Sequence, residues 1–365
     1  MTLHVLHVID GLALGGAERM LVEIANQTHA AGWPVSVCVT RDDVTLAGKL
    51  RAGIDLLVLG RQRRFDVAAM RKLARWCHAH HVDVIHCHGR SSFSLVALLR
   101  LTRQIGVPVL LHDHLGVQLH PDVPWWLRVG HRAAAAYIAI SDDQRAWATR
   151  AGFAADHIHV IRNAVDLEAV AAQTLSGPPL TRRRGYSQLV AIGGIRAEKA
   201  IDVLLRAFAR VEKPAVLHII GGDADRAYAD ECRRLARELN VADRVVFEGP
   251  RPDALALARD ADLAVHAARS ESGPIVLGEY AAIGATFVST LVGSVAHDLA
   301  HAGVGGYVGS DDPAWLASAI DEVLRWSAEE RRQHAIRSRK LALELFDIRR
   351  VMPQWLALYS KVARS

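Results

Sequence analysis

The sequence has few cysteines and no long run of apolar residues. Its four cysteines are Cys38, Cys77, Cys87 and Cys232. They form no CxxC pair and show no disulfide-type spacing, so we expect buried thiols in a reducing cytoplasm. No stretch approaches the roughly 18 uncharged apolar residues of a membrane-spanning helix. Residues 3–9 lack the basic region and cleavage site of a signal peptide, and they favour a buried first strand instead.

What is present is a globular composition with a small excess of positive charge. The 365 residues are 51% apolar and 23% charged, which is enough for two domains with separate cores. The net charge is +5, and the basic cluster between positions 49 and 75 consists of Lys49, Arg51, Arg61, Arg63, Arg64, Arg71, Lys72 and Arg75. Basic surfaces attract phosphorylated substrates and acidic lipid headgroups, although a solvated helix face would have the same composition. No nucleic-acid motif accompanies the cluster, so nucleic acid is not an expected partner.

Short apolar segments alternate with helix-like segments along the chain. This alternation predicts parallel sheets covered by helices on both faces. Residues 171–187, rich in glycine, proline and arginine, interrupt it and are expected to be a linker. We therefore predict an N-terminal Rossmann-like domain over residues 1–170, a second one over 188–345, and a separate amphipathic helix over 346–365.

The most informative stretch is residues 271–279, with the sequence ESGPIVLGE. It follows the strand-like segment 261–267 and begins a buried helix, so Glu271 is expected in a loop at the mouth of a pocket. Gly273 leaves backbone N–H groups free at the helix N-terminus, where a phosphate or another anion is favoured. Glu279 has apolar neighbours and needs a partner, because unpaired burial of a carboxylate is costly. Two solvated surface acids are the alternative.

A second anion-binding motif lies near the start of the chain. A predicted strand over residues 4–11 leads into a loop with Gly15 and Gly16, and a helix follows. A strand, a glycine loop and a helix N-terminus form a cradle for phosphate. A Gly-Gly pair alone is a weak signal, and its place between a strand and a helix strengthens it.

Together these segments resemble the family 4 retaining glycosyltransferases of the GT-B fold, over nearly the whole chain. The matching segments, in the family's order, are 15–19 (GGAER), 83–88 (DVIHCH), 160–166 (VIRNAVD), 195–205, 271–279 and 305–320. Six motifs in the right order are specific, although each alone is not. The resemblance implies an α/β fold of two doubly wound Rossmann-like domains facing across a cleft. It also implies an acceptor-binding N-domain, a donor-binding C-domain and a final helix that crosses back to the N-domain.

The resemblance implies which residues hold the donor. Gly15 and Gly16 correspond to the loop that packs against the donor diphosphate. Lys199 corresponds to the lysine that stabilises negative charge on the leaving phosphate. Glu279 corresponds to the glutamate that holds the ribose hydroxyls. The donor-binding segment that precedes it is Ser272, Gly273, Pro274 and Ile275.

Two further residues correspond to family residues near the reacting carbon. Glu271 matches a glutamate close to the sugar, and His114 matches a histidine that reaches the transferred sugar. With Lys199, these are the expected catalytic residues. The sequence offers no obvious nucleophile for a covalent sugar intermediate. We therefore expect front-face attack with retention of configuration, in which the enzyme positions the substrates and stabilises the diphosphate.

The family pattern is broken at three positions. Gly194 replaces the arginine that usually stands five positions before the lysine, and Arg196 on the same turn is the candidate to replace its charge. Ala200 replaces the glycine after the lysine, and Thr286 replaces a proline in a later loop. These departures leave open a catalytically weak subunit that binds a nucleotide sugar. A GT-B nucleotide-sugar epimerase is the other alternative.

Two His-x-His pairs, His86/His88 and His112/His114, raise the alternative of a zinc site. Asp113 would lie on the opposite face of its strand, and 19 histidines make chance pairs common. We therefore expect no metal, and no cofactor besides the nucleotide-sugar substrate.

The acceptor is expected in the N-domain, which also holds the basic cluster. The adjacent Trp125 and Trp126 suit an interface that is half apolar and half wet, although they could equally cap a core. We expect a hexose from a UDP- or GDP-type donor to pass to a sugar or lipid-linked acceptor in bacterial polysaccharide, lipopolysaccharide or glycolipid synthesis. The protein is expected in the cytoplasm, where these features could dock it to the anionic inner face of the membrane.

Overall fold

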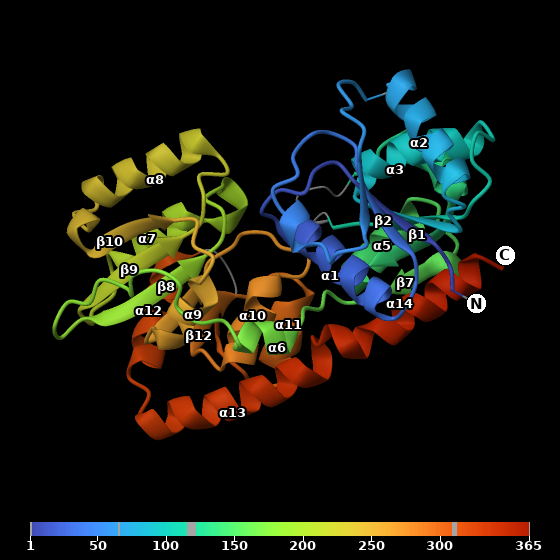
Figure 1. The fold of residues 1–365 in the computed structure, drawn as a ribbon. Coiled ribbons are helices and arrows are strands. Elements are labelled where there is room, and N and C mark those ends of the chain that lie inside the picture. Colours follow the sequence, from blue (N-terminus) through green and yellow to red (C-terminus); the bar gives the residue numbers. More distant parts are fainter. Residues whose placement is uncertain (1, 65, 115–121, 309–311, 365) are drawn as a thin grey trace. The chain divides into compact units, whose positions relative to one another are not determined.

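The computed structural model describes residues 2–64, 66–114, 122–308 and 312–364. The chain divides into two compact units (Figure 1). Unit 1 comprises residues 1–164 and 348–365, and unit 2 comprises residues 165–347. Of the late motif 305–320, residues 309–311 lie outside the described part.

Unit 1 is built on a parallel sheet of seven strands in the described part of the chain, in the order β3-β2-β1-β4-β5-β6-β7. The strands are β1 (Val5–Ile9), β2 (Val35–Val39), β3 (Asp55–Val58), β4 (Val84–His88), β5 (Val109–His112), β6 (Ala134–Ala139) and β7 (Ile158–Val160). Every residue of β1, β2, β4 and β5 is buried, as expected for a sheet covered on both faces. The strand order reverses between β1 and β4. In open α/β sheets, ligands bind at the carboxyl ends of the strands at such a point.

The helices of unit 1 follow the strands as the alternation predicts. The main ones are α1 (Gly16–Ala30), α2 (Val67–Ala79), α3 (Arg90–Leu101), α5 (Asp142–Arg150) and α14 (Ile348–Val362), with the short α4 (Leu127–Gly130) before β6. Side-chain caps begin α2 and α5. The carboxylate of Asp66 accepts from Ala69 N at 3.1 Å, and the hydroxyl of Ser141 accepts from Gln144 N at 3.2 Å.

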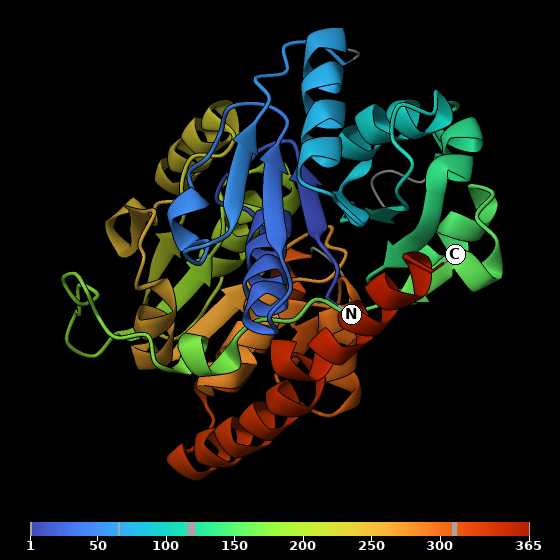
Figure 2. The ribbon, with the colours of Figure 1, turned by 45° about the vertical axis from the view of Figure 1, so that its right-hand side comes forward.

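The last helix, α14, belongs to unit 1, as the expected return to the N-domain requires. It lies beside α1 in both views (Figures 1 and 2) and contacts it. Its buried residues recur at helical spacing and form one apolar face: Ile348, Val351, Met352, Trp355, Leu358, Tyr359 and Val362. Within that face, the Tyr359 hydroxyl lies 2.8 Å from Nδ1 of His86 on β4.

The hydrogen bond between Tyr359 and His86 gives a testable measure of how α14 is held. Both side chains are fully buried. Tyr359→Phe should therefore lower the free energy of unfolding of unit 1 by about 1–3 kcal/mol, because it leaves His86 Nδ1 without its partner. Urea unfolding measures this, with Tyr186→Phe at a half-buried tyrosine of unit 2 as the control. An unchanged free energy in Tyr359→Phe would contradict the prediction.

Unit 2 repeats the architecture with a parallel sheet of six strands among its described residues, in the order β10-β9-β8-β11-β12-β13. The strands are β8 (Ser187–Ile192), β9 (Ala215–Ile220), β10 (Val245–Gly249), β11 (Leu263–His266), β12 (Phe287–Thr290) and β13 (Gly306–Val308). The helices are α6 (Leu167–Ala171), α7 (Ile201–Phe208), α8 (Arg226–Glu238), α9 (Ala254–Asp260), α10 (Ile275–Ile283), α11 (Ser294–His301), α12 (Pro313–Leu324) and α13 (Ala328–Leu345). Both units are thus Rossmann-like.

The boundaries between the units differ from the expected ones. Residues 165–170, predicted to end the first domain, belong to unit 2, where most of them form helix α6, which packs against α10. The expected linker 171–187 also belongs to unit 2. Asp253 accepts hydrogen bonds from Ser176 N at 2.9 Å and Gly177 N at 3.0 Å, and Arg251 donates to Pro178 O at 2.8 Å. The segment has a linker's composition, but these contacts fix it to α9 and the loop before it.

The chain passes between the units twice, at 164/165 and at 347/348. Val165 N donates to Phe346 O at 2.9 Å, so both connections leave unit 2 at the same point. The amphipathic helix predicted from residue 346 begins at Ile348, directly after Asp347, which forms a β-bridge with Val165.

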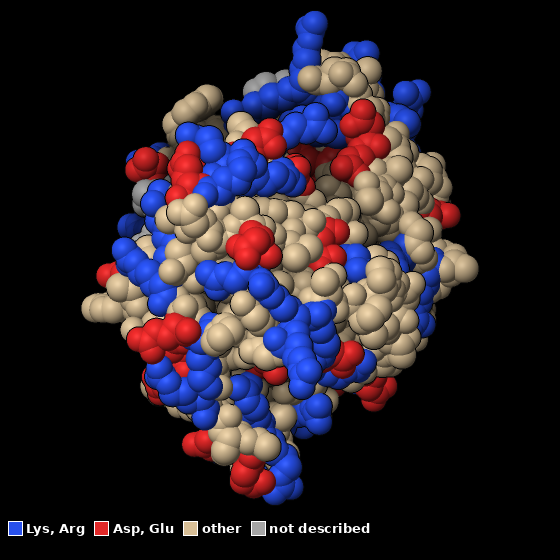
Figure 3. All heavy atoms as spheres, turned by 90° about the vertical axis from the view of Figure 1, so that its left-hand side faces the viewer, with Lys and Arg blue, Asp and Glu red and all other residues tan. Residues whose placement is uncertain are grey.

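The surface carries charges of both signs. On the face in Figure 3, basic and acidic side chains are interspersed with uncharged residues. Within the described ranges, no helix is long and apolar enough to cross a membrane.

Candidate functional site

The first candidate site lies in unit 2, at the carboxyl ends of β8 and β11. These two strands are paired neighbours in the sheet. β8 leads into the short 3-10 turn Ala197–Lys199, and β11 leads into the loop that contains Glu271. Because the carboxyl ends of parallel strands meet at one edge of a sheet, Lys199 and Glu271 come together although they are 72 residues apart.

Lys199 and Glu271 form an ion pair, with Nζ of the lysine donating to Oε1 of the glutamate. Their side chains are only 17% and 16% exposed. Nε2 of His266, at the end of β11, lies 3.5 Å from the same oxygen. Burial alone would raise the pKa of Glu271, but the Lys199 charge and the neighbouring His266 lower it to about 2. Burial also lowers the pKa of His266, so Glu271 is ionised beside a neutral imidazole.

Arg269 holds the two loops against each other. Its backbone N–H donates to Glu198 O at 2.9 Å, and its Nη1 donates to Ala197 O at 3.0 Å. The guanidinium also binds both carboxylate oxygens of Asp202 in α7, at 2.9 and 2.6 Å. A bidentate pair of this kind is strong and directional. Arg269 is therefore a positioning residue that places Lys199 opposite Glu271.

The glycine loop before Lys199 has little space for side chains. A Cβ atom at Gly194 would lie 3.2 Å from Cβ of Ala224, so an arginine there would have to push the neighbouring loop away. Arg196 is half exposed, and its Nε lies 3.9 Å from Oε2 of Glu198. Ala200 adopts φ +50°, the left-handed conformation that favours glycine, so the departure from the family's glycine leaves a strained backbone at this position.

The loop after Glu271 leads directly into α10. Ser272, Gly273 and Pro274 are buried, Pro274 is the N-cap residue, and Ile275 is the first residue of the helix. Ser294 N, at the start of α11, donates to Ser272 O at 2.9 Å and fixes the loop. The helix N-terminus therefore lies beside the Lys199–Glu271 pair, where it favours an anion.

Glu279 lies further along the same helix, α10. It is 1% exposed, and its helical neighbours Leu277 and Tyr280 are fully buried. The expectation of a buried carboxylate rather than a solvated surface acid agrees with this position. The structure thus brings Lys199, Glu271 and the 272–275 segment to one edge of unit 2, and Glu279 is buried in the helix that this segment begins.

The second candidate site is a cavity of about 620 Å³ in unit 1. It lies where β1, β2 and β4 end and α3 begins. Charged, polar and aromatic side chains form much of its lining: Asp10, Arg41, Arg61, Arg63, Arg64, Arg90, Ser91, His88, His114 and Trp126. Ala17 and Glu18, which follow the Gly15-Gly16 loop, also line it.

The remaining predicted residues of unit 1 lie at or near this cavity. Gly15 is the N-cap of α1 and Gly16 its first residue, as the cradle motif predicts. The two tryptophans separate: Trp125 is 79% exposed, whereas Trp126 faces the cavity with the guanidinium of Arg64 5.2 Å from the centre of its ring. The two tryptophans therefore have different surroundings, although they are adjacent in the sequence.

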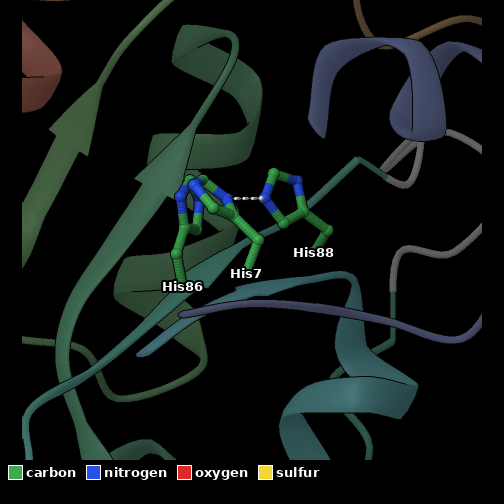
Figure 4. A group of neighbouring side chains, drawn as sticks. All are labelled: His7, His86 and His88. Carbon is green, nitrogen blue, oxygen red and sulfur yellow. Dashed lines mark hydrogen bonds between the residues drawn. The ribbon is translucent and has the colours of Figure 1, made fainter. Parts of the chain in front are cut away.

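Five histidines gather on one face of the unit 1 sheet. His7 on β1 lies opposite His86 on β4, and His88 lies opposite His112 on β5. Nδ1 of His7 is 3.0 Å from Nε2 of His88 (Figure 4), and Nδ1 of His88 is 3.2 Å from Nε2 of His114. Burial lowers the pKa of all five imidazoles, to about 3 for His7 and His114, so the rings are neutral.

Neutral rings linked in this way fix one another's tautomers. In each nitrogen-nitrogen contact one ring donates and the other accepts, so the proton on His88 determines which nitrogen of His114 carries a proton. Two groups have ring nitrogens within 4.8 Å of one another, a spacing that metal ligands could adopt with some movement: His7, His86 and His88, and His88, His112 and His114. The two His-x-His pairs were apparent from the sequence, but no local pattern predicted that His7 would join them.

Two family models match the chain in succession. "Glycosyltransferase Family 4" matches residues 14–169, and "Glycosyl transferases group 1" matches residues 187–325. The chain belongs to the family 4 glycosyltransferases. The epimerase alternative is not favoured by these matches.

Relatives of this glycosyltransferase are distant over the full length. The N-acetyl-alpha-D-glucosaminyl L-malate synthase of Bacillus anthracis is 22% identical over 82% of this chain and 80% of its own. The D-inositol 3-phosphate glycosyltransferase of Mycolicibacterium smegmatis is 35% identical, but over only 46% of this chain and 40% of its own length. The solved structure of Anabaena HepE in complex with UDP-glucose has a TM-score of 0.83, covering 98% of this chain and 99% of its own at 20% identity. This similarity shows the GT-B fold.

Sequence reasoning missed several residues that shape the glycosyltransferase's two sites. Arg269 stands two residues before the ESGPIVLGE motif, and that proximity was the available signal. His266 carried no signal beyond its place at the end of a strand. Arg61 was noticed only as one member of the basic cluster, and Arg90 was not singled out at all. Their importance comes from burial, which no local pattern predicts.

Proposed function

We propose that this glycosyltransferase moves a hexose from a UDP- or GDP-type nucleotide sugar to an acceptor, with retention of the anomeric configuration. The observation that carries the proposal is the Lys199–Glu271 pair beside the N-terminus of α10, with Glu279 buried in the same helix. A cation, a helix N-terminus and a carboxylate at one edge suit the diphosphate and ribose of a nucleotide. The structural similarity to HepE, which was solved with UDP-glucose, supports the same donor class.

The proposed roles divide between the units. In unit 2, Lys199 stabilises charge on the leaving phosphate, Glu279 holds the ribose hydroxyls, and Glu271 lies close to the sugar. In unit 1, the Gly15-Gly16 loop meets the diphosphate and His114 reaches the transferred sugar. Attack occurs on the front face, and the leaving phosphate takes the acceptor's proton. Trapping a glycosyl-enzyme on a carboxylate would refute this mechanism.

For the acceptor we propose a sugar or a lipid-linked sugar bound in the unit 1 cavity. The setting we propose is bacterial polysaccharide, lipopolysaccharide or glycolipid synthesis in the cytoplasm, with peripheral docking at the inner membrane face. The exposed Trp125 and the basic cluster support docking, because an aromatic ring and cations suit an anionic lipid surface.

Nucleotide binding tests the donor site directly. Thermal unfolding is followed with UDP, GDP, ADP and TDP for the wild type, for Glu279→Ala, and for Glu238→Ala as an exposed control on α8. A nucleotide at about 100 times its Kd should stabilise the wild type by roughly 2.7 kcal/mol, and Glu279→Ala should lose this shift. The shift should persist in a chelator, since we propose that no metal takes part.

The outcome also distinguishes an active glycosyltransferase from the remaining alternative, a subunit that only binds a nucleotide sugar. If one nucleotide binds but no acceptor in a broad screen releases free nucleotide, the chain is a nucleotide-sugar-binding subunit. If no nucleotide shifts the wild type, the proposed donor site is wrong.

A further inference from the structure

We propose that His88, His112 and His114 form a binding site for a divalent transition metal of the zinc class at the wall of the unit 1 cavity. A metal held there would be an inhibitor of the transferase and not a cofactor, because it would occupy the imidazole proposed to reach the transferred sugar. The site itself stands on the geometry of unit 1, whereas its inhibitory effect rests on the role of His114 in the function proposed above.

The three imidazoles come together from two neighbouring strands. His88 ends β4, His112 ends β5, and the two residues are paired in the sheet. His114 follows two positions after His112, and the centres of these two rings are 3.9 Å apart. One ring nitrogen of each residue lies within 4.8 Å of those of the other two. The sequence spacing accounts for His112 with His114, but only the sheet adds His88 to them.

The distance between His88 and His114 is that of two ligands on one zinc ion. Nδ1 of His88 lies 3.2 Å from Nε2 of His114. Tetrahedral zinc, with bonds of about 2.0–2.1 Å to nitrogen, holds its ligand atoms about 3.3 Å apart. An ion would therefore replace the hydrogen bond between these two rings with almost no change in the distance between the nitrogens.

His112 supplies the third ligand, because its imidazole has no other partner in the described part of the chain. The residue is fully buried. Neither its Nδ1 nor its Nε2 forms a hydrogen bond with any of the described residues. A buried polar atom without a partner costs free energy, and coordination of a metal would satisfy one of these two nitrogens.

The surroundings suit neutral imidazole ligands. Burial lowers the pKa of all three rings, so no proton has to leave before a metal binds. Nε2 of His88 lies 3.0 Å from Nδ1 of His7 (Figure 4). When Nδ1 of His88 binds a metal, its Nε2 carries the ring proton and donates to His7. An outer hydrogen bond of this kind fixes the orientation of a metal-binding imidazole.

The cavity provides an entry path and selects the class of metal. His88 and His114 line it, so an ion reaches them from the cavity, where water completes its coordination. Five arginines also line the cavity. Their charge disfavours Mg²⁺ and Ca²⁺, which bind mainly to charged oxygen ligands. Zn²⁺ and Co²⁺ form coordination bonds to neutral imidazole, so we expect these ions to bind and Mg²⁺ not to bind.

Titration of the chelator-treated, full-length protein with Zn²⁺ tests the site by calorimetry. His112→Gln should weaken zinc binding by about 100-fold or more, because the loss of an outer partner alone costs about 10- to 100-fold. His301→Gln, which changes an exposed histidine of unit 2, should leave zinc binding unchanged. Equal zinc binding in the wild type and in His112→Gln would overturn the site, since other histidines would explain it. Absence of binding to the wild type would overturn it as well.

A second variant and a spectroscopic probe keep the test decisive if His112→Gln fails to fold. His114 is half-buried at the cavity, so His114→Gln should also weaken zinc binding, and thermal unfolding of the metal-free variants reports whether they fold. Co²⁺ should give the visible absorption of tetrahedral coordination in the wild type, and Zn²⁺ should displace it. Co²⁺ that binds to His114→Gln with an unchanged spectrum would contradict the proposed ligands.

His7→Gln distinguishes this site from the neighbouring group of His7, His86 and His88. The substitution removes only an outer partner of His88, so it should weaken zinc binding less than His112→Gln does. Loss of zinc binding in His7→Gln, with full binding in His112→Gln, would overturn the assignment to His112.

Transfer assays separate a failure of this proposal from a failure of the proposed function. Zn²⁺ should inhibit the wild type, a chelator should restore the activity, and His112→Gln should need about 100-fold more Zn²⁺ for the same inhibition. Zinc that binds to His88, His112 and His114 without inhibiting transfer would refute the role of His114 at the sugar, and with it the inhibitory effect. Absence of every nucleotide shift in the metal-free wild type would refute the donor site alone.

Discussion

Lys199→Met is expected to lower kcat by about 100- to 1,000-fold, with a much smaller change in KM for the donor. The lysine ammonium is already held in place by Glu271 in a largely buried pair, so in the proposed mechanism it needs no reorganisation as charge develops on the leaving phosphate. A group that interacts more strongly with the transition state than with the substrate affects kcat rather than KM. Steady-state kinetics with an accepted donor and acceptor measure the effect.

The same substitution should also change the pH dependence of stability. The pKa of Glu271 is lowered from its usual value of 4.5 to about 2, so ionised Glu271 stabilises unit 2 above about pH 4.5, and this contribution is lost as the pH falls toward 2. Without Lys199, burial raises the pKa of Glu271, and unit 2 should lose stability at neutral pH.

A double variant separates the two roles of Lys199. Lys199→Met with Glu271→Gln removes the uncompensated carboxylate, so stability at neutral pH should recover while kcat stays low. A kcat within about fivefold of the wild type in Lys199→Met would show that the lysine acts only through the structure.

Arg90→Leu is expected to lower the free energy of unfolding of unit 1 by about 3–5 kcal/mol, the range for breaking a buried ion pair from one side. Nε of Arg90 donates to Oδ2 of Asp113 at 2.7 Å, and the guanidinium lies 3.9 Å from the centre of the Trp147 ring. The Tyr137 hydroxyl donates to the same carboxylate oxygen at 3.0 Å. Asp113 is fully buried, so the variant leaves a buried carboxylate without its cation.

Urea unfolding of Arg90→Leu, Asp113→Leu and the double variant measures the coupling. The double variant should be less destabilised than the sum of the single variants, because it removes the unpaired charge. Strictly additive effects, or a decrease in the free energy of unfolding below about 1 kcal/mol in Arg90→Leu, would contradict the assignment of a stabilising buried ion pair.

Asp113 binds Arg90 and Tyr137 in the core of unit 1 and not the histidine cluster, as its place on the opposite side of the strand predicted.

Much of the fold and some of the site were accessible from the sequence, for local reasons. Buried strands of parallel sheets are continuous apolar runs, and glycine loops before helices are local signals, so the alternation gave both sheets. The helix beginning at Ile275 and the buried Glu279 followed from their immediate neighbours. The resemblance to a family added the order of the two domains and the return of α14 to the first.

Contacts between distant segments were not accessible in the same way. The linker was misplaced because its composition says nothing of Asp253, about 76 residues later, which binds its backbone. His7 joins the histidines of β4 only because β1 and β4 are neighbours in the sheet. The adjacent Trp125 and Trp126 differ in exposure because one faces solvent and the other the cavity.

By itself, the sequence determined the doubly wound architecture and the short segments that approach a ligand, because hydrophobic periodicity and loop chemistry are encoded locally. Only the tertiary structure decided that Arg269 clamps Lys199 against Glu271, and that Arg61, one member of the basic cluster, is buried beside Asp10 and Ser91. Burial and pairing depend on strand order, which brings residues far apart in the sequence to one edge of a sheet.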